Sequence, residues 1–226
     1  MRIDILTLFP EMFAPLKESI VGRAVDSGKI EIVITDIRDY TENKHRRCDD
    51  YPFGGGAGMV MMPQPIASAI EAVDPDHEAY RIYTSPKGKT FSQKMVLPLI
   101  KKKRILILCG HYEGVDQRVL DMFIDEEISL GDFVLTGGEL PAMAITDAVC
   151  RYIDGVISSE SLEQESFTGG TLEYPQYTRP ACFRGVSVPE VLLSGNHAEI
   201  DKWRFSQSKK ITEERRPDLI DASKKE

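Results

Sequence analysis

Two kinds of segment alternate along the first two-thirds of the chain, as judged from the spacing of hydrophobic and polar positions. Short apolar runs rich in β-branched residues predict strands, and apolar residues at helical spacing predict helices. The predicted strands are 3–8, 30–34, 81–84, 104–109 and 127–130. The predicted helices are 16–25, 63–73, 91–101, 115–123 and 139–153. This alternation favours an α/β fold, with a mostly parallel sheet covered by helices on both faces.

The pattern changes after residue 157. Residues 158–171 are polar, acidic and contain glycine, which is typical of a linker. Residues 172–226 hold short helical patterns around 188–193 and 198–207, with prolines between them. We therefore expect a first domain over 1–157, a linker over 158–171 and a small, mainly helical second domain over 172–226.

The balance of charge argues against indiscriminate binding to nucleic acid, because 28 basic and 36 acidic residues give a net charge of −8. The charges are segregated, however. Residues 81–104 hold eight basic residues and no acid, whereas residues 105–150 hold nine acids and one base. A basic stretch of this kind can form a phosphate-binding face, or its lysines can simply favour the C-terminus of a helix. Charge alone leaves both interpretations open.

Neither a membrane span nor a zinc site is expected. No apolar run approaches the roughly 18 residues of a span, and the apolar run at 3–8 includes Asp4, so it predicts a strand rather than a signal peptide. We expect a soluble, cytoplasmic protein. The four cysteines are too far apart for a zinc knuckle, and we expect buried, reduced thiols. They are Cys48, Cys109, Cys150 and Cys182.

Glycine clusters lie after predicted strands or before predicted helices, at 54–58, 110–114 and 131–138. In parallel sheets, ligands bind beyond the carboxyl ends of the strands, where glycine allows the backbone to approach them closely. A dinucleotide fingerprint would need glycine in place of Met59, and a P-loop would need glycine in place of Tyr83. An NAD enzyme and a P-loop NTPase are therefore disfavoured. Two clusters at consecutive strand ends predict a pocket lined by backbone, which suits an uncharged purine ring.

Two long, ordered strings are more specific than any short motif. They are Gly-His-Tyr-Glu-Gly-Val-Asp at 110–116 and Ile-Ser-Leu-Gly-Asp-Phe-Val-Leu-Thr-Gly-Gly-Glu-Leu-Pro-Ala at 128–142. With these strings the chain resembles the bacterial tRNA (guanine-N1)-methyltransferases, the TrmD type of the SPOUT superfamily. Further matching segments extend the resemblance over nearly the whole chain, at 8–13, 49–62, 174–180, 192–197 and 203–204.

The resemblance implies a deep trefoil knot in the first domain that binds S-adenosyl-L-methionine, the methyl donor. It implies a homodimer with its active site at the subunit interface, where the second domain of one chain helps to hold tRNA on the other. The reaction implied is methylation of N1 of guanosine 37 in tRNA, with guanosine preferred at position 36. A dependence on Mg2+ is implied by the resemblance alone.

The resemblance also assigns residues. Those expected to bind the cofactor are Tyr83, Thr84, Ser85, Pro86, Gly110, Tyr112, Glu113, Gly114, Ser129, Leu130, Gly131, Asp132, Phe133, Val134, Leu135, Gly137, Gly138 and Pro141. Those expected to contact RNA are Ser166, Arg179, His197 and Arg204, together with the basic stretches 44–47 and 81–104.

The chemistry explains the two catalytic candidates. Guanine N1 carries a proton at neutral pH, so methylation needs a base at N1 and a positive group for the charge that develops on O6. Glu165 stands where the family has the proposed aspartate base, with Glu163 as the fallback, and Arg151 matches the arginine held to stabilise O6. Glutamate keeps the carboxylate but changes its reach by one methylene.

Two alternatives remain open. One is another methyltransferase of the same superfamily, acting on ribose or on ribosomal RNA. The other is an RNA-binding module that holds the cofactor without catalysis, which the replacement of aspartate by Glu165 suggests.

Overall fold

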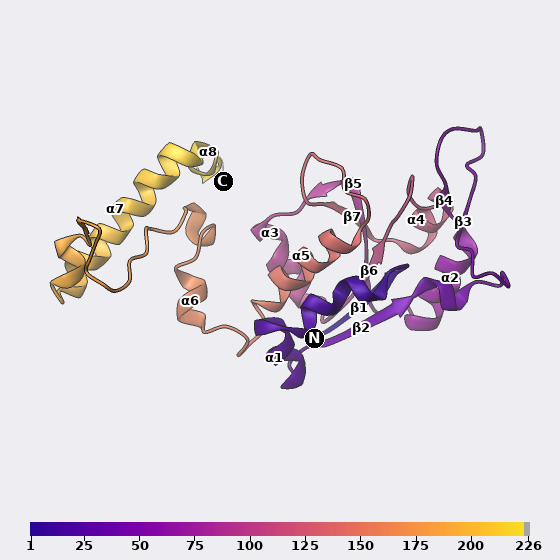
Figure 1. Cartoon of the computed structure of the whole chain (residues 1–226), viewed down its shortest axis with the longest axis horizontal. Coiled ribbons are helices and arrows are strands. Elements are labelled where there is room, and N and C mark those ends of the chain that lie inside the picture. The colour runs from indigo at the N-terminus through magenta and orange to yellow at the C-terminus, as the bar shows by residue number, and fades with distance from the viewer. Residues whose placement is uncertain (224–226) are drawn as a thin grey trace. The chain divides into compact units, whose positions relative to one another are not determined.

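The computed structural model describes residues 1–223. The chain divides into two compact units, Met1–Ile157 and Ser158–Glu226, each with its own internal contacts. Residues 224–226, the end of the predicted second domain, lie outside the described residues. Both units are drawn in Figure 1.

The first unit is built on a five-stranded sheet in the order β2-β1-β6-β5-β7. Every neighbouring pair in this sheet is parallel. Its strands are β1 (Arg2–Thr7), β2 (Glu31–Asp36), β5 (Tyr80–Thr90), β6 (Arg104–Cys109) and β7 (Glu126–Ser129). The mostly parallel α/β fold predicted from the sequence is therefore confirmed, and all five strands have their carboxyl ends at one edge.

Helices cover both faces of this sheet, as Figure 1 shows. On one face pack η1 (Pro10–Lys17), α1 (Ser19–Asp26), α3 (Gln93–Lys101) and α5 (Glu139–Cys150). On the other face pack η2 (Ile37–Tyr40), α2 (Pro63–Val73) and α4 (Gln117–Phe123). A short antiparallel pair lies outside the sheet, β3 (Asp49–Asp50) with β4 (Val60–Met61).

Successive side chains of a strand pack into two different hydrophobic cores, one on each face of the sheet. In β6, Ile105 and Ile107 point into one core and Leu106 and Leu108 into the other, and all four side chains are buried. Successive side chains of a strand point to opposite faces, so a strand covered on both faces must be apolar throughout. This explains why 104–109 is the most hydrophobic run of the predicted strands.

The structure departs from the predicted elements where local geometry intervenes. The helix expected over 16–25 is interrupted at Glu18, whose backbone is extended, so that residues 16–17 end η1 and α1 begins at Ser19, which has a φ of 54°. Strand β5 runs on to Thr90 instead of ending at Thr84, with an irregularity between Thr84 and Lys89 in its pairing with β7. Helix α5 ends at Cys150 rather than at residue 153.

Buried ion pairs tie the amino ends of the strands together. Arg81 Nε lies 2.8 Å from Asp74 Oδ2, with both side chains almost fully buried. Arg104 Nε lies 3.0 Å from the buried Asp4 and its Nη1 lies 3.4 Å from Asp74. The expectation that the basic stretch 81–104 contacts RNA is therefore wrong for Arg81, because its guanidinium is buried in an ion pair with Asp74.

The second unit holds the short helix α6 (Ser159–Glu163), η3 (Thr168–Gly170), the two-stranded β8 (Cys182–Phe183) and β9 (Val186–Ser187), η4 (Glu190–Leu193), α7 (His197–Arg215) and α8 (Pro217–Ser223). Segment 158–171, expected as a linker, contains α6 and η3 and clusters with this unit. The Leu172 amide donates to Thr212 on α7, which joins the end of that segment to the long helix.

Cys48, Cys109 and Cys150 are buried, as expected, but Cys182 is exposed, so the expectation of burial is wrong for that thiol. All four are unpaired. Within the described residues, no helix is long and apolar enough to cross a membrane.

Loss of the carboxylate in Asp74→Asn should lower the free energy of unfolding by about 3–5 kcal/mol at pH 7, because the buried Arg81 would keep its charge without a counter-ion. Burial alone raises the pKa of Asp74, but hydrogen bonds from Arg81 and from the amides of Ala79 and Glu78 outweigh it, so the pKa lies below its ordinary value. The stabilisation is thus fully present above the ordinary pKa of 3.8 and is lost as the pH falls through the lower native pKa.

Urea unfolding of both proteins at several pH values measures this difference. Glu71 is exposed on α2, so Glu71→Gln is the control, and its free energy of unfolding should equal that of the wild type. A difference below 1 kcal/mol at pH 7 would contradict the role of the ion pair.

Candidate functional site

A cavity of about 240 Å³ opens at the carboxyl ends of β6 and β7 and beside the point in β5, Thr84, where its pairing with β6 ends. Its wall is formed by 83–87 within β5, by 110–115 after β6, by 127–130 at the end of β7 and by the segment 133–138 that leads into α5. Strand β6 follows β5 along the chain and lies on one side of it, whereas the next strand, β7, lies on the other side. The direction in which strands are added to the sheet therefore reverses here. Ligands of open parallel sheets bind at such a reversal.

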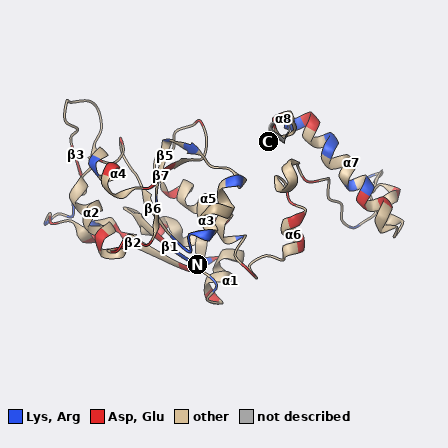
Figure 2. Cartoon of the chain, turned by 180° about the vertical axis from the view of Figure 1, so that it is seen from behind, with Lys and Arg blue, Asp and Glu red and all other residues tan. Residues whose placement is uncertain are grey.

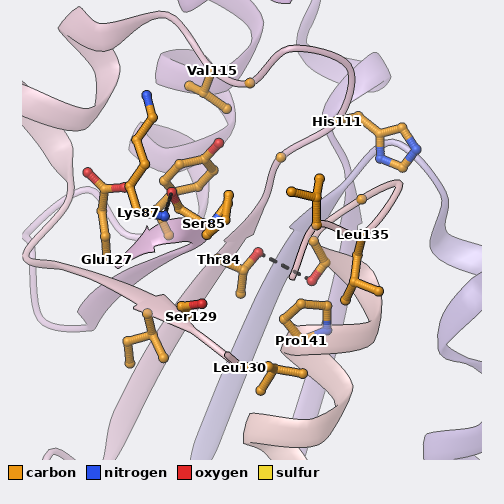
Figure 3. Close-up of a pocket in the computed structure, with 18 of the residues that line it drawn as sticks. Thr84, Ser85, Lys87, His111, Val115, Glu127, Ser129, Leu130, Leu135 and Pro141 are labelled. Carbon is orange, nitrogen blue, oxygen red and sulfur yellow. Dashed lines mark hydrogen bonds between the residues drawn. The ribbon is translucent and has the colours of Figure 1, made fainter. Parts of the chain in front are cut away.

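The cavity has an apolar and a polar side. Figure 3 shows Leu130, Leu135 and Pro141 on one side of Thr84, with Lys87 and Glu127 on the other. Such a cavity can hold a flat apolar ring on the first side and charged or hydroxyl groups on the second.

Close backbone contacts shape the wall. The Gly138 amide donates to the Gly110 carbonyl at 2.8 Å, and the Thr84 hydroxyl donates to the Gly138 carbonyl at 3.2 Å. The second of these bonds is the dashed line in Figure 3. A Cβ at Gly138 would lie 2.9 Å from Cys109 Cα and 2.9 Å from the Gly110 nitrogen. Only glycine fits where the segment before α5 meets the end of β6.

The loop 110–116 is held from its other side by β4 and the residue before it. The Met61 amide donates to the Gly114 carbonyl at 2.9 Å, and the Glu113 amide donates to the Met59 carbonyl at 2.9 Å. A Cβ on Gly58 would lie 2.4 Å from Glu113 Oε1. The glycine-rich loop 54–58 therefore supports the Glu113 side chain, which lines the cavity.

A buried carboxylate lies behind the wall. Glu139, in the first turn of α5, is 1% exposed and accepts a hydrogen bond of 2.8 Å from the buried Thr7 hydroxyl. Its other oxygen lies 3.4 Å from Nδ1 of His111, whose ring packs against Phe9. Negative charge is favourable at a helix N-terminus, so Glu139 stabilises the start of α5 and steers the His111 ring at the edge of the cavity.

Burial keeps two groups beside the cavity protonated. Burial, reinforced by the nearby Glu127, raises the pKa of Tyr83 to about 12. Burial, with a smaller contribution from Glu139, raises the pKa of the Cys109 thiol well above its ordinary value. Tyr83 is therefore a neutral wall, and Cys109 has little thiolate with which to act as a nucleophile.

Of the residues predicted to bind the cofactor, 16 line the cavity, and Gly131 and Asp132 do not. Gly131 instead leaves room for the Phe133 ring, which would lie 2.8 Å from a Cβ placed there. Sequence reasoning missed the polar residues Lys87, His111, Gln117, Glu127 and Thr136 and the apolar Val115, Leu120 and Ile128. Glu127 could have been found, because it precedes Ser129 by two residues on one strand and so shares its face.

The catalytic candidates come from both units. Arg151 follows the last residue of α5, and its amide donates to the Asp147 carbonyl at 3.1 Å. Glu165 is half-buried in the second unit and lines a cavity of about 190 Å³ there, as does Glu163. The Ser166 hydroxyl accepts from the Glu173 amide at 3.0 Å, which fixes the chain beside Glu165.

Of the RNA candidates, Arg179, His197 and Arg204 lie farther along the second unit, whereas the basic stretches 44–47 and 81–104 lie in the first unit. Arg204 is on α7, along which basic and acidic residues alternate in Figure 2, and His197 is the first residue of that helix. Arg179 is exposed. Arg46, from the basic stretch 44–47, is paired with Asp39.

In the part of the chain that the structure describes, no three histidine, cysteine, aspartate or glutamate side chains gather where they could hold a metal ion. Mg2+ usually keeps several waters and is held by only one or two carboxylates together with substrate phosphates. The dependence on Mg2+ therefore stays a prediction.

The fold and cavity define an α/β protein with a cavity at the carboxyl-terminal side of its parallel sheet. A family model described as "tRNA (Guanine-1)-methyltransferase TrmD" matches residues 1–222. The tRNA (guanine-N(1)-)-methyltransferase of Clostridium botulinum strain Hall is 57% identical over 221 residues, which is 97% of this chain and 92% of that protein. Those of Clostridium novyi and Clostridium perfringens strain ATCC 13124 are each 56% identical, over 97% and 99% of this chain and 91% and 95% of theirs. The chain belongs to the tRNA (guanine-N1)-methyltransferase family.

Gly138→Ala should lower the free energy of unfolding by about 1–3 kcal/mol, because the added methyl group would press on the backbone of Cys109 and Gly110. Thr136→Ala is the control, because Thr136 is exposed in the same segment, and its free energy of unfolding should stay close to that of the wild type. Thermal unfolding measures both, and equal losses would contradict the close backbone contact.

Proposed function

We propose that this protein transfers a methyl group from S-adenosyl-L-methionine to N1 of guanosine 37 in tRNA, with guanosine preferred at position 36. The observation that carries the proposal is the cavity beside Thr84 in β5 and at the ends of β6 and β7, in a chain whose relatives are named for guanine-N1 methylation. We also propose that the protein is cytoplasmic, because its proposed substrate is tRNA.

The residues of the cavity fit the proposed cofactor. Gly110 and Gly138 line the cavity with backbone alone, and Leu130, Leu135 and Pro141 offer an apolar surface for a purine ring. On the polar side, Lys87 and Glu127 supply one positive and one negative group, as the zwitterionic end of an amino acid requires. Glu127 Oε2 is buried without a hydrogen-bond partner within the described structure, which leaves an acceptor for such a ligand.

When bound, adenosylmethionine supplies a methyl group on a positively charged sulfur, with its own leaving group. The chain's residues must then align the guanine, remove its N1 proton and balance the charge on O6. Glu165 is the proposed base, Glu163 the fallback, and Arg151 the proposed positive group at O6. Ser166 positions the base through the bond that its hydroxyl accepts from the Glu173 amide.

The remaining expectations belong to the same proposal. The first domain, 1–157, contains the trefoil knot, and the return of residues 130–138 to the end of β6 supports this. A linker, 158–171, joins it to the tRNA-binding domain, 172–226, in which Arg179, His197 and Arg204 contact RNA. The active site forms between two subunits. Exposed Phe9, Met12 and Leu140 support a dimer, since they leave apolar surface on and beside the packed elements η1 and α5.

A methylation assay with four tRNA transcripts tests the proposal. The transcripts combine guanosine or adenosine at positions 36 and 37, and radioactive adenosylmethionine is the donor. We expect methyl transfer only where position 37 is guanosine, and fastest where 36 is guanosine too. Transfer at a ribose, or at a different nucleotide, would favour another methyltransferase of the superfamily. Cofactor binding without transfer would favour a non-catalytic RNA-binding module.

Removal of the proposed base in Glu165→Gln should abolish single-turnover methyl transfer, while calorimetry finds the affinity for adenosylmethionine within a few-fold of wild type. Arg151→Ala should slow transfer by roughly 100-fold, the scale for losing one electrostatic partner of a transition state. Glu160→Gln, in the same segment as Glu165, is the control and should transfer at the wild-type rate. Normal transfer by Glu165→Gln would exclude Glu165 as the base.

A further inference from the structure

The second unit contains a cavity of its own, with a volume of about 390 Å³. Three aromatic residues (Tyr174, Tyr177 and Trp203) and two arginines (Arg179 and Arg204) line it, and no aspartate or glutamate belongs to its lining. The charge of Arg204 is partly balanced by Asp201, whose Oδ1 lies 3.6 Å from Nη1, and Arg179 is exposed. A ligand with a flat ring and a negative group fits the aromatic rings and the arginines of this cavity.

The aromatic side chains form a wall rather than a closed core. The rings of Tyr177 and Trp203 lie 6.3 Å apart between centroids and are tilted by 55°. The Tyr177 side chain is 48% exposed and Trp203 is half-buried, so both keep surface that a ligand can cover. Partly exposed aromatic faces of this kind serve as stacking surfaces for unstacked nucleobases.

Arg204 packs beside the aromatic wall and has one buried N–H group without an acceptor among the described residues. Its guanidinium lies 4.9 Å from the centre of the Tyr174 ring, and Nη1 lies 3.6 Å from Asp201 Oδ1. Its Nε is buried and has no hydrogen-bond partner among the described residues. Buried N–H donors are nearly always satisfied in folded proteins. A donor left over at a cavity wall indicates that a ligand atom supplies the acceptor.

The wall is held in place by the fold of the unit. Trp203 and Arg204 are on α7, whose first turn is capped by the side chain of Asn196. Tyr174 comes from a different segment, and its hydroxyl donates to Gln164 Oε1 at 2.5 Å. Two segments far apart in sequence thus present their aromatic side chains to one cavity, which is preorganised for binding.

We propose that this cavity binds a single unstacked nucleotide of RNA, with its base against Tyr177 and Trp203 and its phosphate beside Arg179. This proposal rests on the proposed function, because that function makes tRNA the RNA in question. The Arg204 Nε donates to an acceptor on the base, and the exposed Arg179 neutralises the phosphate. A nucleotide can reach this cavity only from a loop or another unpaired region, since a base within a helix remains stacked.

Trp203 reports on the cavity directly, because it is the only tryptophan in the chain. The experiment titrates the full-length protein with an unstructured RNA hexamer and follows tryptophan fluorescence. We expect saturable quenching by the hexamer and none by inorganic phosphate at the same phosphate concentration. Equal quenching by inorganic phosphate would overturn the proposal in favour of a simple anion site, and absence of quenching by the hexamer would overturn it altogether.

Three variants and a control locate the contacts. Tyr177→Ala and Arg204→Gln should each weaken hexamer binding roughly tenfold, through lost stacking and a lost donor. Arg179→Gln should reduce the slope of log affinity against log salt by about 0.7, the value for one phosphate contact on a single strand. Arg215→Gln, exposed at the end of α7 and outside the cavity lining, should bind normally. Circular dichroism checks that each variant is folded, and affinities unchanged in folded Tyr177→Ala and Arg204→Gln would overturn the proposal.

The methylation assay separates this proposal from the proposed function. Methyl transfer to tRNA by a protein whose Trp203 fluorescence does not respond to the hexamer would overturn the nucleotide site alone. Saturable quenching by a protein that transfers no methyl group would support the nucleotide site and leave the proposed function without its activity.

Discussion

The contact of Gly138 with Thr84 in β5 and with Gly110 at the end of β6 is the constraint on which the candidate site depends. The Gly138 amide donates to the Gly110 carbonyl, and the Gly138 carbonyl accepts from the Thr84 hydroxyl. These two bonds close the cavity between the strands and α5. Because this contact is between backbones, it leaves no room for a Cβ at Gly138. The helix that begins there brings the buried Glu139 to Thr7 and His111, so the same contact also fixes the edge of the cavity.

Charge along the chain is a poor guide to charge on the surface. Arg81 begins the long basic stretch of the sequence, yet the fold buries it against Asp74. Arg104, at the other end, reaches Asp4 and Asp74 in the same network. Burying an ion pair costs solvation that its partners only partly return, so these pairs hold strand ends together rather than add much net stability. The cationic cavity of the second unit, by contrast, lies in a segment whose overall composition is mixed.

The two units carry different parts of the proposed chemistry. The first offers a cavity shaped by backbone, which suits a neutral purine and a zwitterion and needs no net charge of its own. The second offers carboxylates at Glu163 and Glu165 beside a cavity with arginines and aromatic rings. The proposed donor site and the proposed RNA site lie on separate units, so each can be shaped for its own ligand.

The alternation of strands and helices can be predicted from the amino-acid sequence, because periods of 2 and 3.6 are local properties of the chain. The glycine clusters are local too, as are the two long strings at 110–116 and 128–142 that carry the resemblance to the family. The break in the first helix at Glu18 and the extension of β5 to Thr90 are not predictable in this way, because they follow from pairing and packing. Lys87, His111 and Glu127 join the cavity wall, Gly131 does not, and Arg81 is buried, only once the chain has folded. A wall or an ion pair joins residues distant in sequence, and their meeting depends on strand order and register, which no local pattern records.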